Sequence, residues 1–141
     1  MAKRNLAELT IPASPEFISV AKRVATTLGG QLGLSLMDLD ELSIALTQAC
    51  DSAIGAAEDL GLPSNLKLSY FATNRALVVD VDLMPTGAAL PVPAQAHVTH
   101  IDPELQRLAY EMIRCFVDDF RPVIEPRTGH VSFRMVKHLA G

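Results

Sequence analysis

The sequence contains no tryptophan, few aromatic residues and only two cysteines. Cys50 and Cys115 each lie in a helical pattern among apolar neighbours, and no C-x-x-C pair or Cys/His cluster accompanies them. We therefore expect two buried free thiols in a reducing compartment, and neither a redox pair nor a metal site. His97 and His100 are three residues apart in a proline-rich segment with no further ligand nearby, so we interpret them as solvated.

Long hydrophobic runs and an excess of basic charge are also missing. No segment approaches the length that crosses a membrane, and residues 1–10 lack the apolar core of a signal peptide. The formal net charge is −4, which argues against nucleic acid as the main partner. We expect a cytoplasmic protein.

The composition that remains is that of a folded globular protein. Hydrophobic residues make up 49% and charged residues 20% of the 141 residues. A chain of this length can bury a substantial core, and it shows no internal repeat or linker. We expect residues 1–141 to form one domain.

One segment, residues 38–57, predicts a long amphipathic helix around which the chain is organised. Asp38 is the expected N-cap, Glu41 completes a capping box, and Met37 with Leu42 forms a hydrophobic staple. Two polar residues one turn apart, Gln48 and Ser52, fall at the edge of its apolar stripe, where ligand clefts often have their polar groups. The stripe itself recurs at three- and four-residue steps: Leu42, Ala45, Leu46, Ala49, Cys50, Ala53, Ile54 and Ala57.

The other periodic segments predict an α+β fold, a two-layer sandwich of about three helices on one face of a mixed or antiparallel sheet. Two further helices begin where a capping residue precedes a proline, at Ser14-Pro15 and Asp102-Pro103. A proline-rich loop is expected over residues 84–100. The strands are expected at residues 6–11, 66–73, 76–83, 120–125 and 130–136.

Both flanking helices have predicted apolar stripes. Gly29-Gly30 is expected to stop or fray the first of these helices near its C-terminus. The stripe of the first helix consists of Phe17, Val20, Ala21, Val24 and Leu28. That of the other helix consists of Leu105, Leu108, Ala109, Met112, Ile113 and Phe116.

Four stretches, taken in order, resemble the anti-sigma factor branch of the gyrase/histidine-kinase/MutL ATPase superfamily, which contains bacterial anti-sigma serine kinases. They are TIPASPEFISVAKRV, SIALTQACDSAI, IRCFVDDF and TGHVSFRMVKHL. The resemblance implies the histidine-kinase-like ATPase fold, with an ATP pocket between the helices and the sheet. It extends over nearly the whole chain.

The resemblance assigns family functions to two positions of the central helix. The family's E-x-x-x-N places a general base and a magnesium ligand one turn apart, and here Gln48 and Ser52 stand at those positions. Glutamine cannot act as a base, and serine reaches less far toward Mg²⁺ than asparagine.

The family's two glycine motifs are also changed. In D-x-G-x-G, Leu83 replaces the adenine-binding aspartate, and only Gly87 of the glycines is kept. A one-residue slip would offer Asp82, which points to the opposite face. Arg107 and Ala109 fall at the glycines of the phosphate-binding box. We interpret Arg107 as a solvated helix residue.

These changes predict a non-catalytic anti-sigma-like regulator with a degenerate ATP site and with no bound cofactor or metal. The partner would be a sigma factor or a STAS-type antagonist of one, contacted through Glu16, Lys22 and Arg23, and the protein would be a homodimer, as family members commonly are. An active ATP-dependent serine kinase is the main alternative. A small-molecule or peptide binder and an ordinary α+β domain are two others. The alternative for Glu16, Lys22 and Arg23 is a solvated helix face.

Overall fold

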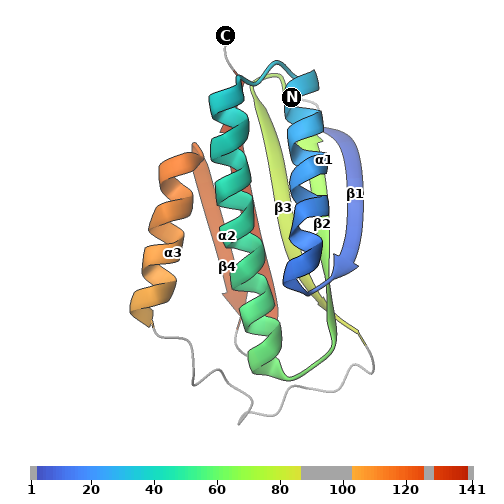
Figure 1. The fold of residues 1–141 in the computed structure, drawn as a ribbon, viewed down its shortest axis with the longest axis vertical. Helices are drawn as coiled ribbons and strands as arrows, with labels where there is room; N and C mark the ends of the chain where they lie inside the picture. The colour runs from blue at the N-terminus through green and yellow to red at the C-terminus, as the bar shows by residue number, and fades with distance from the viewer. Residues whose placement is uncertain (1–2, 87–102, 126–128, 140–141) are drawn as a thin grey trace.

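A computed structural model describes residues 3–86, 103–125 and 129–139. Within these residues, helices cover one face of a five-stranded sheet (Figure 1), which confirms the predicted α+β class and order of elements. All neighbouring strands are antiparallel, in the order β1-β2-β3-β5-β4. The elements are β1 (Arg4–Pro12), the 3-10 helix η1 (Pro15–Phe17), α1 (Ile18–Gln31), α2 (Leu36–Leu60), β2 (Ser64–Ala72), β3 (Ala76–Pro85), α3 (Pro103–Phe116), β4 (Asp119–Glu125) and β5 (His130–His138).

Strand β3 shows how the sheet divides its residues between two faces. Alternate residues from Leu77 to Leu83 are at most 2% exposed and face the helices. Asp80 and Asp82 lie between them and are half-buried on the opposite face. Arg134 of the neighbouring strand donates two hydrogen bonds of 2.8 Å to the Asp80 carboxylate. The alternation predicted for this strand is therefore confirmed.

Helix α2 lies between α1 and α3 in the helical layer (Figure 1). It begins earlier than predicted, because Ser35 is the N-cap and its Oγ accepts a hydrogen bond of 3.1 Å from the Asp38 N–H. The predicted cap at Asp38 is therefore wrong. The predicted hydrophobic staple is also wrong, since Met37 is 72% exposed. The helix ends at Gly61, whose φ of 66° is typical of a C-cap glycine.

The apolar stripe predicted for α2 is confirmed. All eight of its residues are buried and belong to the hydrophobic core. Five of the eight are small (four alanines and one cysteine), so α2 can lie close to the sheet and to the helices beside it.

Helix α1 packs most of the predicted stripe against the core. Ala21 is buried, and Phe17, Val24 and Leu28 are partly buried against the core, whereas Val20 is 41% exposed. The glycine pair lies in the last turn of the helix, which ends one residue later, at Gln31. A Cβ atom added to Gly29 would lie 2.7 Å from Leu39, so this glycine lets α1 and α2 approach closely. The buried residues are Ile18, Ala21, Ala25 and Gly29.

Helix α3 is the element for which the predicted burial is most clearly wrong. Of the predicted stripe only Ile113 is buried, while Leu105, Leu108 and Met112 are 64%, 55% and 44% exposed. Cys115 is exposed as well, contrary to the prediction, whereas Cys50 of α2 is buried as expected.

The predicted loop over residues 84–100 lies only partly within the described residues. Strand β3 continues to Pro85, so Met84 belongs to a strand and not to a loop. The rest of the predicted loop lies outside the described residues, as do His97, His100 and the cap at Asp102. In the described ranges, every helix is too short or too polar to cross a bilayer.

Candidate nucleotide cleft and partner surface

Gln48 and Ser52 are both half-buried on α2, one turn apart, as the sequence predicts. Their side chains offer an amide and a hydroxyl. Both groups can form hydrogen bonds, but neither can accept a proton from an attacking hydroxyl at neutral pH. This pair can position a polar ligand without activating a nucleophile.

Leu83 lies near the end of β3, is 2% exposed, and belongs to the core under the helices. An isobutyl side chain cannot accept the amino hydrogen bond of an adenine ring. The nearest carboxylate in the strand, Asp82, is on the opposite face of the sheet. In the register of the two strands it stands opposite Lys67 of β2. The helix side of this strand end is therefore apolar.

Arg107 and Ala109 lie inside α3, beyond its first turn. Backbone N–H groups at such positions form hydrogen bonds within the helix, and only the first four N–H groups of a helix are free to bind an anion. The Arg107 side chain is exposed and lies 3.0 Å from Glu104 Oε2. The interpretation of Arg107 as a solvated helix residue is confirmed.

The cleft positions are distributed over neighbouring elements. Helix α2, which carries Gln48 and Ser52, contacts both β3 and α3, the elements that carry Leu83 and Ala109. Gly87 lies outside the described residues. Within the described ranges, no three His, Cys, Asp or Glu side chains are grouped closely enough to hold a metal ion.

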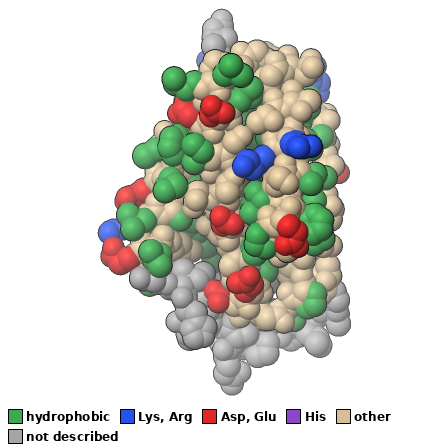
Figure 2. All heavy atoms as spheres, in the orientation of Figure 1, with side chains coloured by type: hydrophobic (Ala, Val, Ile, Leu, Met, Phe, Trp, Pro, Cys, Tyr) green, Lys and Arg blue, Asp and Glu red, His purple; other side chains and the backbone are tan. Residues whose placement is uncertain are grey.

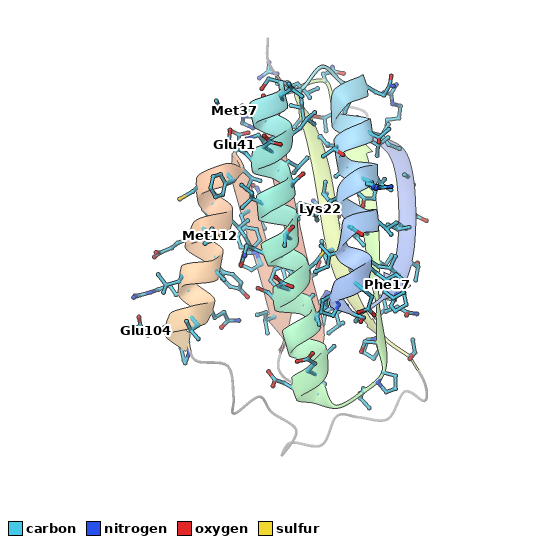
Figure 3. All side chains as sticks on the ribbon, viewed as in Figure 1. Phe17, Lys22, Met37, Glu41, Glu104 and Met112 are labelled. Carbon is cyan, nitrogen blue, oxygen red and sulfur yellow. The ribbon has the colours of Figure 1, made fainter. Side chains whose placement is uncertain are left out.

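The predicted partner residues all come from η1 and α1. Glu16 and Arg23 are exposed, and Lys22 is half-buried at the surface of α1 (Figure 3). Neither Lys22 nor Arg23 forms an ion pair with any residue that the structure describes. Both cations remain available to an acidic partner.

Two titratable groups, Cys50 and Tyr70, lie in the hydrophobic core. Burial, and secondarily the charge of Asp51, raises the pKa of the Cys50 thiol to about 12. Burial also raises the pKa of Tyr70, whose hydroxyl donates a hydrogen bond of 2.9 Å to the Ala21 carbonyl oxygen. The raised pKa values favour the neutral form of both side chains.

Sequence reasoning missed two features of the surface. Six acidic residues and no basic residue occur in α2, and α3 exposes three large apolar side chains, Leu105, Leu108 and Met112. The sequence does contain a sign of the exposed apolar residues of α3, because the apolar arc of this helix includes Tyr110 as well as the predicted stripe. Such an arc is wider than a single contact with α2 and the sheet can bury.

No protein-family model matches the chain. Among curated proteins it is similar to serine-protein kinase RsbW of Halalkalibacterium halodurans, with 26% identity over 72 residues, which are 51% of this chain and 44% of that protein. It is also similar to serine-protein kinase RsbW of Bacillus velezensis, with 30% identity over 47 residues, 33% of this chain and 29% of that protein. The matches span less than half the length of each relative. They confirm the resemblance of this chain to the serine-kinase branch of the superfamily.

Proposed function

We propose that this protein is an anti-sigma-type regulator that binds a sigma factor, or an antagonist of one, without using ATP. The similarity to two RsbW proteins supports the regulatory class. One observation carries the loss of nucleotide use: Leu83, at the family's adenine-binding position, is 2% exposed in an apolar core.

The other cleft positions support the same conclusion. Losing a charge-assisted hydrogen bond to adenine costs about 1.5–3 kcal/mol. Position 48 supplies no base, and positions 107 and 109 lie in a helix whose own hydrogen bonds occupy their N–H groups. Each change weakens a different part of nucleotide binding, so we expect no useful affinity for ATP.

Titration of the purified protein with ATP and Mg²⁺ tests the nucleotide part of the proposal. We expect no saturable binding up to millimolar ATP. Micromolar binding would overturn this part. It would favour the second candidate, an active serine-protein kinase, which is supported by the similarity to two serine-protein kinases.

The proposed partner surface is the outer side of η1 and α1, with Glu16, Lys22 and Arg23. Each sigma factor of the organism, and each STAS-type protein, can be tested for co-elution with the purified chain. Reversing both cations (Lys22→Glu with Arg23→Glu) should weaken the complex about tenfold or more, because charge complementarity is lost.

A matched control reverses two cations on the uncovered face of the sheet, Lys67→Glu with Arg121→Glu. This variant should bind normally. An equal loss of partner binding in both variants would show that the contact surface is not on α1. We also propose a homodimer, which sedimentation equilibrium of the free protein tests directly.

A further inference from the structure

Helix α3 displays an apolar seam to solvent, formed by Leu105, Leu108 and Met112. These residues are 64%, 55% and 44% exposed, although the same helix buries Ile113 against the core. In Figure 2, apolar side chains gather over α3 at the left of the helical face. The seam is therefore a second apolar side of a helix whose inner side is already packed.

The spacing of the seam residues indicates the shape of what covers them. Steps of three and then four residues form a straight stripe along a helix, the pattern that packs against another helix. The two arginines of α3 are already engaged within the chain. Arg107 pairs with Glu104 at 3.0 Å, and Arg114 lies over the Phe120 ring at 5.4 Å.

The charge beside the seam is negative. Helix α2, which packs along α3, contains six acidic residues and no lysine or arginine. Lys137 offsets two of them, lying 3.7 Å from Asp38 and 3.8 Å from Glu41. Asp40, Asp51 and Glu111 are exposed and form no ion pair with any described residue.

This charge selects among the occupants of an apolar seam. A second copy of the chain would bring two acidic α2 helices toward one another, and an anionic membrane would be repelled by the same carboxylates. A segment with basic residues beside its apolar stripe would be attracted. We propose that the α3 seam docks a basic amphipathic helix of a protein partner.

The site is distinct from the proposed α1 surface, because α1 and α3 lie on opposite sides of α2 (Figure 1). The inference does not rest on what α1 binds. A peptide assay that uses only the seam therefore separates its failure from failure of the proposed function.

The probe is a designed, fluorescently labelled helical peptide with leucine at alternating three- and four-residue steps and lysine or arginine on both flanks. Its binding to the full chain is measured by fluorescence anisotropy. We expect saturable binding that weakens as salt is added. A peptide with the same leucines and with glutamate on the flanks should not bind.

Variants assign the binding to the seam. Leu108→Glu and Met112→Glu should each weaken binding about tenfold or more, the loss expected for a central apolar contact. Val123→Glu is the matched control, because Val123 is 48% exposed on β4 and is not part of the helical layer. It should bind the peptide normally. Circular dichroism of each variant verifies that it is folded.

Three results would overturn the proposal. Equal binding of the basic and acidic peptides would remove the selection by charge. Equal loss in Val123→Glu and Leu108→Glu would remove the assignment to α3. Self-association or binding of anionic vesicles that Leu108→Glu abolishes, without peptide binding, would give the seam a different occupant.

Discussion

The Nζ atom of Lys137 lies 2.8 Å from the carbonyl oxygen of Phe116, the last residue of α3. Lys137 projects from β5 toward the helices and is 7% exposed. Carbonyl groups at the end of a helix have no partner within it and carry partial negative charge, so a cation there is favourable. A single lysine thus links the sheet, the end of α3 and the acidic start of α2.

Replacing this lysine, Lys137→Met, should lower the free energy of unfolding by about 1–3 kcal/mol, because it removes a charged donor and leaves two carboxylates without their cation. Urea unfolding measures the change. Lys67→Met, at a half-buried lysine on the uncovered face of the sheet, should change stability by less than about 0.5 kcal/mol. Similar losses in the two variants would contradict a specific contribution from Lys137.

The two adjacent glycines of α1 should respond differently to alanine. A Cβ at Gly30 meets nothing within 4 Å, so Gly30→Ala should stabilise the protein by about 0.5–1 kcal/mol through helix propensity. A Cβ at Gly29 would lie 2.7 Å from Leu39 and 2.9 Å from Leu34. Overpacking costs about 1–3 kcal/mol, so Gly29→Ala should be the less stable of the two. Thermal unfolding of both variants gives the order, and the reverse order would contradict this packing.

The two cysteines should differ in reactivity toward a thiol reagent in the folded protein. Cys115 is exposed, whereas Cys50 is fully buried and its pKa is raised to about 12. We expect rapid modification of one thiol per chain, and of the second only after denaturation, since the thiolate is the reactive species. Cys115→Ala should abolish the rapid reaction. Two rapid thiols in the native wild type would show that α2 opens readily.

Stability should decline in alkaline solution. The folded-state pKa of Cys50 is raised from its ordinary value of 9.0 to about 12, and burial also raises that of Tyr70 above its ordinary value of 10.0. The stabilisation from these raised values is complete below the unfolded values and is lost as pH rises toward the folded ones. Urea midpoints between about pH 8 and pH 11 should therefore fall.

The variant Cys50→Ala should show a smaller decline over this alkaline range than the wild type, because one of the two buried groups no longer ionises. Cys115→Ala, at the exposed thiol, should keep the wild-type decline. Identical slopes in all three proteins would mean that other groups control alkaline unfolding.

The sequence predicted the fold well because its strongest patterns come from burial. The eight-residue stripe of α2 and the alternation of β3 are consequences of one face meeting the core, and both are confirmed. The predicted N-cap of α2, Asp38, was wrong, because Ser35, three residues earlier, is the N-cap in the structure, and serine and aspartate are about equally favourable there. Only the backbone conformation, extended at Ser35, separates them.

The surface was less predictable, for a physical reason. An apolar residue on a helix satisfies the pattern whether it faces the core or a partner, so Leu105, Leu108 and Met112 could not be distinguished from Ile113. Lys137 breaks the apolar alternation of β5, and the predicted strand ends two residues before the observed end at His138. Its burial depends on the end of α3 and on carboxylates of α2, groups remote in sequence.

The strand order leaves β1 and β4 outermost, each with one unpaired margin. An intruding strand from another molecule would need a regular row of N–H donors there. Pro122 in β4 has no such hydrogen to give, and the register of β1 shifts between Asn5 and Ala7. Edge-to-edge pairing of sheets into fibrils is therefore disfavoured at both edge strands, even where the concentration of the protein is high.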